Sequence, residues 1–183
     1  MTRIIAGEKR GTILQTLEGD RTRPTTDRVR EALFGCIQFE IAGANVLDLF
    51  AGSGALGLEA LSRGAACAVF CDRYDETVKI IKGNIAKLGY ETRSQLIKND
   101  YIHAIKVFQN TEKFDIVLID PPYKSGYYET VLELLARENV LKHGAILVAE
   151  SEEPVEAAVD GYHVYKNKRY GKTFLTFFRW DKG

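Results

Sequence analysis

Five short apolar segments alternate with helix-like segments through the middle of the chain, and this alternation limits its possible folds more than any other feature. The alternation predicts βαβ units, in which helices join parallel strands and cover both faces of a sheet. Right-handed crossovers are expected throughout. The expected strands are 45–50, 67–71, 95–98, 114–119 and 145–149, and the expected helices between them are 55–63, 75–88, 102–109 and 127–137.

The two ends of the chain depart from this pattern. Residues 162–165 and 174–178 have strand-like sequences on either side of a polar segment, which predicts an antiparallel hairpin at one edge of the sheet. Near the start, residues 3–6 and 12–17 flank a turn with two glycines and predict a second, smaller hairpin. A helix is expected over 27–38, since a threonine precedes it and an aspartate lies in its first turn.

The predicted fold class is therefore α/β. We expect a doubly wound, mainly parallel, seven-stranded Rossmann-like sheet with a C-terminal antiparallel hairpin and a small N-terminal hairpin-helix extension. The expected organisation is an extension over residues 1–40, followed by the sheet domain over residues 41–183.

A glycine-rich loop follows the first expected strand. Gly52-Ser53-Gly54-Ala55-Leu56-Gly57 matches G-x-G-x-x-G at the head of a helix, where glycines allow a tight turn and a close backbone approach to a ligand. The pattern serves several nucleotide cofactors, and a plain strand-to-helix turn is the simpler interpretation. Asp72 ends the second strand, twenty residues beyond Gly52, where a carboxylate accepts hydrogen bonds from ribose hydroxyls.

Asp48 decides between two classes of cofactor. A dinucleotide would place its pyrophosphate at the glycine loop, and a carboxylate inside the preceding strand would repel it. The same carboxylate can face the ammonium group of a methionine moiety. The spacing Asp48-x-Phe50-x-Gly52-x-Gly54 resembles motif I of the class I methyltransferases and therefore favours S-adenosylmethionine.

Asn99 and Asp100 end the third strand, where such enzymes bind the adenine amino group. Asp100 also has a simpler interpretation as the N-cap of the next helix, and one residue can serve both purposes. The predicted cofactor-binding residues are Asp48, Phe50, Gly52, Ser53, Gly54, Asp72, Arg73, Asp100 and Tyr101.

A second motif, Asp120-Pro121-Pro122-Tyr123, ends the fourth strand. In doubly wound sheets, ligands bind at the carboxyl ends of the strands. Proline cannot donate a hydrogen bond and restricts the residue before it, so the two prolines predict a rigid turn whose polar groups are acceptors. A proline-rich turn with a core tyrosine would explain the tetrapeptide by itself, but not its position in the chain after the cofactor loop.

Fixed acceptors suit the methylation of an exocyclic amino group on a nucleic-acid base. The lone pair of such a nitrogen is delocalised into the ring, and two acceptors pulling on its hydrogens draw it toward tetrahedral geometry. Preorganised acceptors need no reorganisation during the reaction, and alignment of nitrogen and methyl group lowers the barrier further. The predicted catalytic residues are Asp120, Pro121, Pro122 and Tyr123, with Tyr123 stacking on a base that has left its helix.

Charge is unevenly distributed although the formal net charge is zero. Residues 1–30 have a surplus of three positive charges and residues 166–183 a surplus of five, whereas residues 31–165 carry eight excess negative charges. Two basic ends around an acidic body are typical of a polyanion-binding face, and solvated basic hairpins are an equally good explanation of charge alone.

The sequence indicates no disulfide, metal site or membrane segment. Cys36, Cys67 and Cys71 are expected to be reduced thiols, and no cluster has metal-ligand spacing, so no metal is expected. No apolar run is long enough to span a bilayer, and the first residues do not resemble a signal peptide, which predicts a cytoplasmic protein with no membrane partner. A monomer is expected.

The chain resembles the RsmD family of bacterial 16S ribosomal RNA guanine-N2 methyltransferases nearly from end to end. The segments that carry the resemblance are Arg3–Gly7, Arg10-Gly11, Arg23–Glu31, Asp48–Gly64 and Asp120–Tyr123. The resemblance implies that S-adenosylmethionine is converted to S-adenosylhomocysteine, and that the substrate is 16S RNA in an assembled or assembling small subunit. It also implies that the front hairpin and the Arg23–Arg30 region contact RNA. The predicted RNA-binding residues are Arg3, Lys9, Arg10, Arg23, Thr25, Arg28 and Arg30.

Four alternatives stay open from the residues themselves. A DNA adenine-N6 or cytosine-N4 methyltransferase would use the same tetrapeptide, but such enzymes usually carry a sizeable target-recognition domain. A protein-glutamine methyltransferase also needs fixed acceptors. A non-catalytic RNA-binding assembly factor could keep the fold, although intact motifs argue against it. An NAD-dependent oxidoreductase is disfavoured by Asp48.

Overall fold

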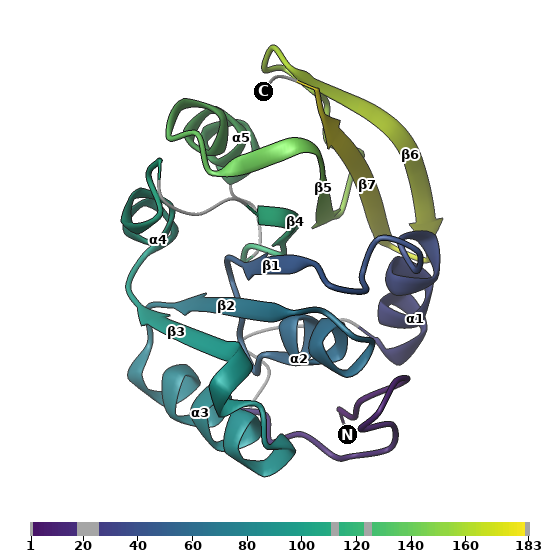
Figure 1. Ribbon diagram of the computed structural model, residues 1–183. Helices are drawn as coiled ribbons and strands as arrows, with labels where there is room; N and C mark the ends of the chain where they lie inside the picture. Colours follow the sequence, from purple (N-terminus) through teal and green to yellow (C-terminus); the bar gives the residue numbers. More distant parts are fainter. Residues whose placement is uncertain (1, 18–25, 111–113, 123–125, 182–183) are drawn as a thin grey trace.

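A seven-stranded sheet forms the centre of the protein, seen in a computed structural model that describes residues 2–17, 26–110, 114–122 and 126–181 (Figure 1). The strands are β1 Asn45–Asp48, β2 Cys67–Asp72, β3 Ser94–Lys98, β4 Phe114–Ile119, β5 Leu141–Ser151, β6 Tyr162–Tyr170 and β7 Thr173–Trp180. The helices are α1 Asp27–Cys36, α2 Ala55–Ser62, α3 Asp75–Leu88, α4 Tyr101–Val107 and α5 Tyr127–Arg137, with a short 3₁₀ turn at Glu91–Arg93.

The strand order is β3-β2-β1-β4-β5-β7-β6. Strands β1 to β5 pair with one another in parallel, whereas β7 is antiparallel to β5 and β6 is antiparallel to β7. The predicted doubly wound sheet with a C-terminal antiparallel hairpin is therefore confirmed.

Each face of the sheet is covered by helices, which explains why the inner strands are apolar on both sides. One core cluster joins the sheet to α1, α2 and α3, and includes Leu33, Leu58 and Ile81. The other joins it to α4 and α5, and includes Ile105 and Leu132. Figure 1 shows the two groups of helices on opposite sides of the sheet.

Local capping signals set several helix ends. Thr26 accepts a hydrogen bond from the Val29 amide (3.3 Å) at the start of α1, as predicted from the threonine before this helix. Asp100 does the same for His103 (2.8 Å) at the start of α4, so its interpretation as an N-cap is correct. Gly89 ends α3.

The N-terminal segment forms a looser hairpin than the sequence predicts. Arg3 and Ile13 make an isolated antiparallel bridge, extended by hydrogen bonds from Ile4 to the Thr12 carbonyl and from Leu14 to the Thr2 carbonyl, both 2.9 Å. Buried Ile4 and Leu14 belong to the same core cluster as α1 and α2. The predicted extension over residues 1–40 thus shares its core with the rest of the protein.

The C-terminal hairpin is longer than predicted. The polar stretch 166–173, expected as a loop, is mostly strand, and only Gly171 and Lys172 lie between β6 and β7. The prediction was wrong because β6 is an edge strand whose polar residues hide its alternation. Its apolar support comes from β7, where Phe177 faces Lys166 and Leu175 faces Lys168. No helix among the described residues is both long and apolar enough to cross a membrane.

Candidate active site

A large cavity opens at the carboxyl ends of β1, β2, β4 and β5, where a doubly wound sheet binds its ligands. Its volume is about 1480 Å³, which exceeds the roughly 300–1,000 Å³ of a pocket for one small ligand. The cavity therefore has room for two molecules. Predicted site residues that line it are Phe50, Gly52, Ser53, Asp72, Arg73, Asp100, Tyr101, Asp120, Pro121 and Pro122.

The glycines of the loop meet two different requirements, a left-handed backbone conformation and close packing. Gly52 (φ 54°) and Gly54 (φ 79°) have left-handed backbone conformations that other residues rarely adopt. Gly57 is required for space instead, because a Cβ there would lie 2.3 Å from the ring of Phe70 on β2. Helix α2 can therefore pack directly on β2, which brings its first turn to the edge of the cavity.

Asp48 supports the loop from behind, which corrects the predicted contact with a methionine ammonium group. The side chain is buried, does not line the cavity, and accepts a hydrogen bond from the Gly57 amide (3.0 Å). Gly54 has no side chain to cap α2, so Asp48 caps the helix from the strand. Burial raises the pKa of Asp48 to about 7, against the effect of the Gly57 hydrogen bond.

Asp72 lines the cavity at the end of β2 and also organises its surroundings. One carboxylate oxygen accepts from the Gly52 amide (3.1 Å) and the other from the Tyr74 amide (3.0 Å). A carboxylate has about four acceptor positions, so these bonds leave acceptor capacity on both oxygens. The pair of bonds fixes the orientation in which Asp72 faces a ligand on the glycine loop.

Three aromatic rings form one wall of the cavity. The centre of the Phe50 ring lies 5.5 Å from that of Tyr101 and 6.0 Å from that of Tyr127, and the centres of the two tyrosine rings are 5.5 Å apart. Tyr127 was not predicted, because it begins α5 far along the sequence from the glycine loop. Arg73 is exposed at the same cavity, with its guanidinium over the Tyr74 ring (4.7 Å).

The predicted catalytic segment meets this cavity from β4. Asp120, Pro121 and Pro122 line it, whereas Tyr123 lies outside the described residues. Because Ile119 is paired with Ala149, Asp120 and Glu150 leave the parallel strands β4 and β5 as neighbours.

Tyr128 stands beside these carboxylates and was missed by the sequence. Its hydroxyl donates to the Glu150 carbonyl (2.6 Å). Burial, followed by Asp120 and Glu150, raises the pKa of Tyr128 above its usual range. The hydroxyl therefore stays protonated and keeps the end of β5 in place.

Asn84 is another unpredicted residue that shapes the site. It is fully buried on α3, and its amide nitrogen donates to the Ser53 carbonyl (2.9 Å) and the Gln15 carbonyl (3.0 Å). Its side-chain oxygen accepts from the Gln15 amide (2.8 Å). A single polar residue inside an amphipathic helix gives little signal in the sequence, yet Asn84 joins the N-terminal segment to the glycine loop.

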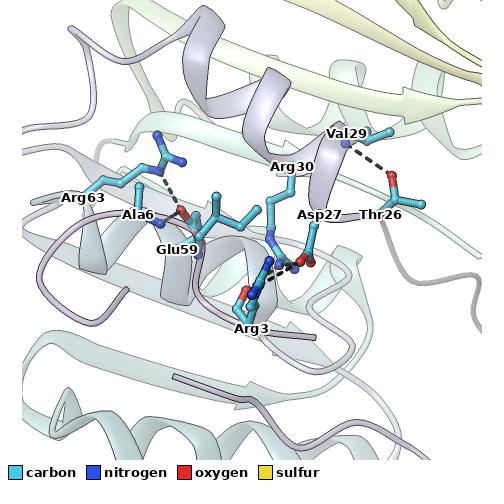
Figure 2. A network of polar contacts seen from close by, with 9 residues as sticks. Arg3, Ala6, Thr26, Asp27, Val29, Arg30, Glu59 and Arg63 are labelled. Carbon is cyan, nitrogen blue, oxygen red and sulfur yellow. Dashed lines mark hydrogen bonds and ion pairs between the residues drawn. The ribbon is translucent and has the colours of Figure 1, made fainter. Parts of the chain in front are cut away.

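Arg30 is almost fully buried, although it contributes to the lining of the cavity, so its RNA contact stays a prediction. Only 1% of its surface is exposed. Figure 2 shows its guanidinium directed at Asp27 and Arg3, with bonds from Nη2 to Asp27 Oδ1 (2.9 Å) and to the Arg3 carbonyl (2.5 Å). Its Nε is buried without a hydrogen-bond partner among the described residues. Arg3 itself pairs with the other Asp27 oxygen (3.2 Å).

The turn of the N-terminal hairpin lies at the C-terminal end of α2, whereas the cavity lies at its N-terminal end. Buried Glu59 accepts hydrogen bonds from the backbone amide of Ala6 and from Arg63 (Figure 2), and also from the Ile5 amide. Ser62 accepts from the amides of Glu8 and Lys9, the next residues along the turn. Helix α2 has eight residues and is therefore about 12 Å long. Lys9, over the Tyr90 ring, and Arg10 are thus displaced from the cavity.

The other predicted RNA-binding residues are either exposed or lie outside the described residues. Arg28 is exposed on α1, and Arg10 is exposed at the N-terminal turn. Arg23 and Thr25 lie outside the described residues. The N-terminal part of the protein lines the cavity with Thr2, Thr16 and Leu17 at the open end of the hairpin and with Arg30 on α1.

The strand order and the position of the cavity at the glycine loop define the class I methyltransferase fold. Residues 2–179 match the family described as conserved hypothetical protein 95, and the chain belongs to this family, which includes the RsmD proteins predicted from the sequence.

Individual relatives agree with this assignment. "Putative rRNA methyltransferase YlbH" of Bacillus subtilis (strain 168) is 35% identical over 180 residues, which cover 97% of this chain and 98% of that protein. "Ribosomal RNA small subunit methyltransferase D" of Escherichia coli (strain K12) is 38% identical over 150 residues, or 82% and 74% of the two chains. The solved structure of "Putative methyltransferase yhhF from Escherichia coli" has a TM-score of 0.88 and 31% identity, and covers 98% of both chains.

Proposed function

We propose that this protein transfers a methyl group from S-adenosylmethionine to the exocyclic N2 of a guanine in 16S ribosomal RNA, within an assembled or assembling small subunit. One observation carries the chemistry: the acceptor-rich turn Asp120-Pro121 and the glycine loop line the same cavity. The choice of RNA rests on family membership and on the names of the relatives.

The residues of the cavity fit this cofactor. Asp72 has acceptor capacity for ribose hydroxyls, Gly52 and Ser53 admit a ligand close to the backbone, and Asp100 and Tyr101 follow β3 where an adenine would lie. Phe50 supplies an apolar surface between the two parts of the site. S-adenosylmethionine, when bound, supplies an electrophilic methyl group and leaves as a neutral thioether.

Asp120 and Pro121 activate the amino group in the proposed reaction. The Asp120 carboxylate and the Pro121 carbonyl accept the two hydrogens of guanine N2, which localises the nitrogen lone pair and aims it at the methyl group. As the new N–C bond forms, N2 loses one proton, and Asp120 is the acceptor within reach. Because proline has no N–H group, the turn presents few donors that would compete for the lone pair.

Substrate choice can be tested directly. Labelled S-adenosylmethionine is supplied with naked ribosomal RNA, small-subunit particles, duplex DNA or protein, and the product is identified by mass spectrometry. We expect N2-methylguanine in the RNA of the particles. N6-methyladenine would refute the guanine assignment, methylglutamine would indicate a protein substrate, and cofactor binding without label in any substrate would favour an assembly factor.

Asp120→Ala tests the catalytic assignment. Loss of one preorganised group of this type lowers kcat by about 10²–10³-fold, while the Kd for S-adenosylmethionine stays within about twofold because Asp72 and the glycine loop are unchanged. Asp120→Asn keeps one acceptor oxygen and should retain more activity than the alanine variant. Calorimetric titration and single-turnover transfer assays measure both quantities. A large loss of cofactor affinity in Asp120→Ala would show that Asp120 binds the cofactor instead.

A further inference from the structure

The β6–β7 hairpin carries cations for which the proposed reaction has no role. Between Gly161 and Trp180 the sequence has five Lys or Arg residues and no Asp or Glu. Starting from the proposed RNA substrate, we infer that this hairpin is a binding surface for the RNA phosphate backbone beside the cavity. The surface consists of Lys166, Lys168, Arg169 and Lys172, and is called the hairpin surface below.

The hairpin surface begins at the cavity itself. Lys172 lies in the turn between β6 and β7 and, together with Thr173, lines the cavity that contains Asp120. From this turn Lys168 and Lys166 follow back along one face of the edge strand β6, and Arg169 projects from its other face. At a rise of about 3.3 Å per residue, the strand from residue 166 to residue 170 spans roughly 13 Å. RNA whose target base enters the cavity would therefore pass its flanking phosphates along this strand.

The charges of the hairpin surface are available to a ligand. Lys168, Arg169 and Lys172 are exposed. None of the four cations is ion-paired to a carboxylate in the part of the chain that the structure describes.

Aromatic rings hold two of these side chains instead. The Lys166 ammonium lies 5.7 Å from the centre of the Phe177 ring, and the Arg169 guanidinium lies 5.4 Å from that of Phe174. Aromatic rings orient cations without neutralising them. The hairpin surface thus keeps its positive charge while losing part of its side-chain freedom, and both properties favour phosphate binding.

Protection of the edge strand is the competing explanation. Lysines on an edge strand prevent it from pairing with other strands, and this would account for Lys166 and Lys168. It does not account for Lys172, which lies in the turn at the cavity, nor for the absence of acidic residues, since a surface adapted only for solubility normally mixes both signs.

The double variant Lys168→Ala/Lys172→Ala tests the hairpin surface. The matched control is Lys82→Ala/Lys106→Ala, which removes the same charge from exposed lysines on α3 and α4 that do not line the cavity. Unmethylated small-subunit particles are the substrate. Transfer kinetics, filter binding of the particles over a range of salt concentrations, and gel filtration are measured for the wild type and for both variants.

We expect the hairpin variant to raise KM for the particle about tenfold or more while kcat and the Kd for S-adenosylmethionine stay within about twofold. The association constant K for the particle falls with salt concentration, and each lost phosphate contact should make the slope of log K against log salt less steep by about 0.7–0.9. The control should match the wild type, and Lys168→Arg/Lys172→Arg should restore binding. Equal particle affinity in the hairpin and control variants would overturn the inference, as would a loss of binding that merely accompanies self-association.

These outcomes are separable from failure of the proposed function. If the wild type neither methylates nor binds the particle, the proposed RNA substrate is wrong, and the hairpin inference falls with it. If the wild type methylates particle RNA and the hairpin variant does so with unchanged KM and salt dependence, the proposed function stands and only the hairpin inference is refuted.

Discussion

The two basic ends of the chain look alike in the sequence and differ in the structure. Two of the four described N-terminal arginines are committed within the protein, since Arg30 is buried against Asp27 and the Arg3 carbonyl and Arg3 shares Asp27 with it, whereas Arg10 and Arg28 are exposed. The C-terminal cations Lys168 and Lys172 are exposed and make no ion pair with any described residue. A count of positive charge therefore does not identify a nucleic-acid surface until pairing and burial are known.

Arg30→Ala should cause the largest loss of stability. The change removes two hydrogen bonds from a buried guanidinium and leaves the Arg3 carbonyl and part of Asp27 without their partner. Asp27 is partly exposed and keeps Arg3 as a partner, so the cost comes from the lost hydrogen bonds and packing of the buried guanidinium, about 2 kcal/mol of unfolding free energy, measured by urea denaturation. Arg28→Ala is the control, since Arg28 is exposed on the same helix, and it should change stability by less than about 0.5 kcal/mol. A stable Arg30→Ala protein with weakened particle binding would reverse the comparison between the two ends.

The contrast between buried and exposed charge extends to the carboxylates. Burial raises the pKa of Asp48 from 3.8 to about 7, so the folded protein binds this proton more tightly than the unfolded chain does. The contribution of Asp48 to the unfolding free energy therefore falls as the pH rises from about 4 to about 7, and this contribution stays constant above that range. Asp48→Asn keeps an oxygen that can accept from Gly57 but does not titrate.

The unfolding free energies of the wild type and of Asp48→Asn should accordingly diverge with pH. Between pH 5 and pH 8 we expect the difference to move in favour of Asp48→Asn by roughly 2–3 kcal/mol, because about 1.4 kcal/mol is lost for each of the two pH units between pH 5 and the folded-state pKa of about 7. Denaturation of both proteins at several pH values measures the difference directly and cancels the other titrating groups. A constant difference across this range would mean that Asp48 is ionised in the folded protein well below pH 7.

Much of the fold was predictable because it follows from short-range periodicity. The strand–helix alternation, the glycine loop and the position of Asp120 after β4 all depend on residues that are neighbours in the sequence. The fate of a polar side chain depends on distant contacts instead. Asp48 was recognised as part of the cofactor region, but its burial behind α2 depends on how closely Gly57 approaches Phe70.

Arg30 shows where a weak signal was present and was not used. In a helix, residue 30 lies on the same face as Leu33 and Phe34, both buried, and one turn from Asp27. An arginine on an apolar helical face with an acid three residues earlier indicates an internal ion pair. Lys172 has no comparable signal, because its place at the cavity is set by the register of β6 and β7.

The smallest change in stability is expected for the double lysine variant of the C-terminal hairpin. Lys168→Ala/Lys172→Ala should change the unfolding free energy by less than about 0.5 kcal/mol, since exposed side chains without buried partners contribute little to folding. Removing two positive charges from a patch that has no acid between Gly161 and Trp180 even relieves some repulsion, so a slight gain in stability is the expected direction. Thermal denaturation of this variant beside Arg30→Ala measures both ends under one condition. A loss of about 2 kcal/mol or more in the lysine variant would show that the hairpin cations, like Arg30, serve the fold.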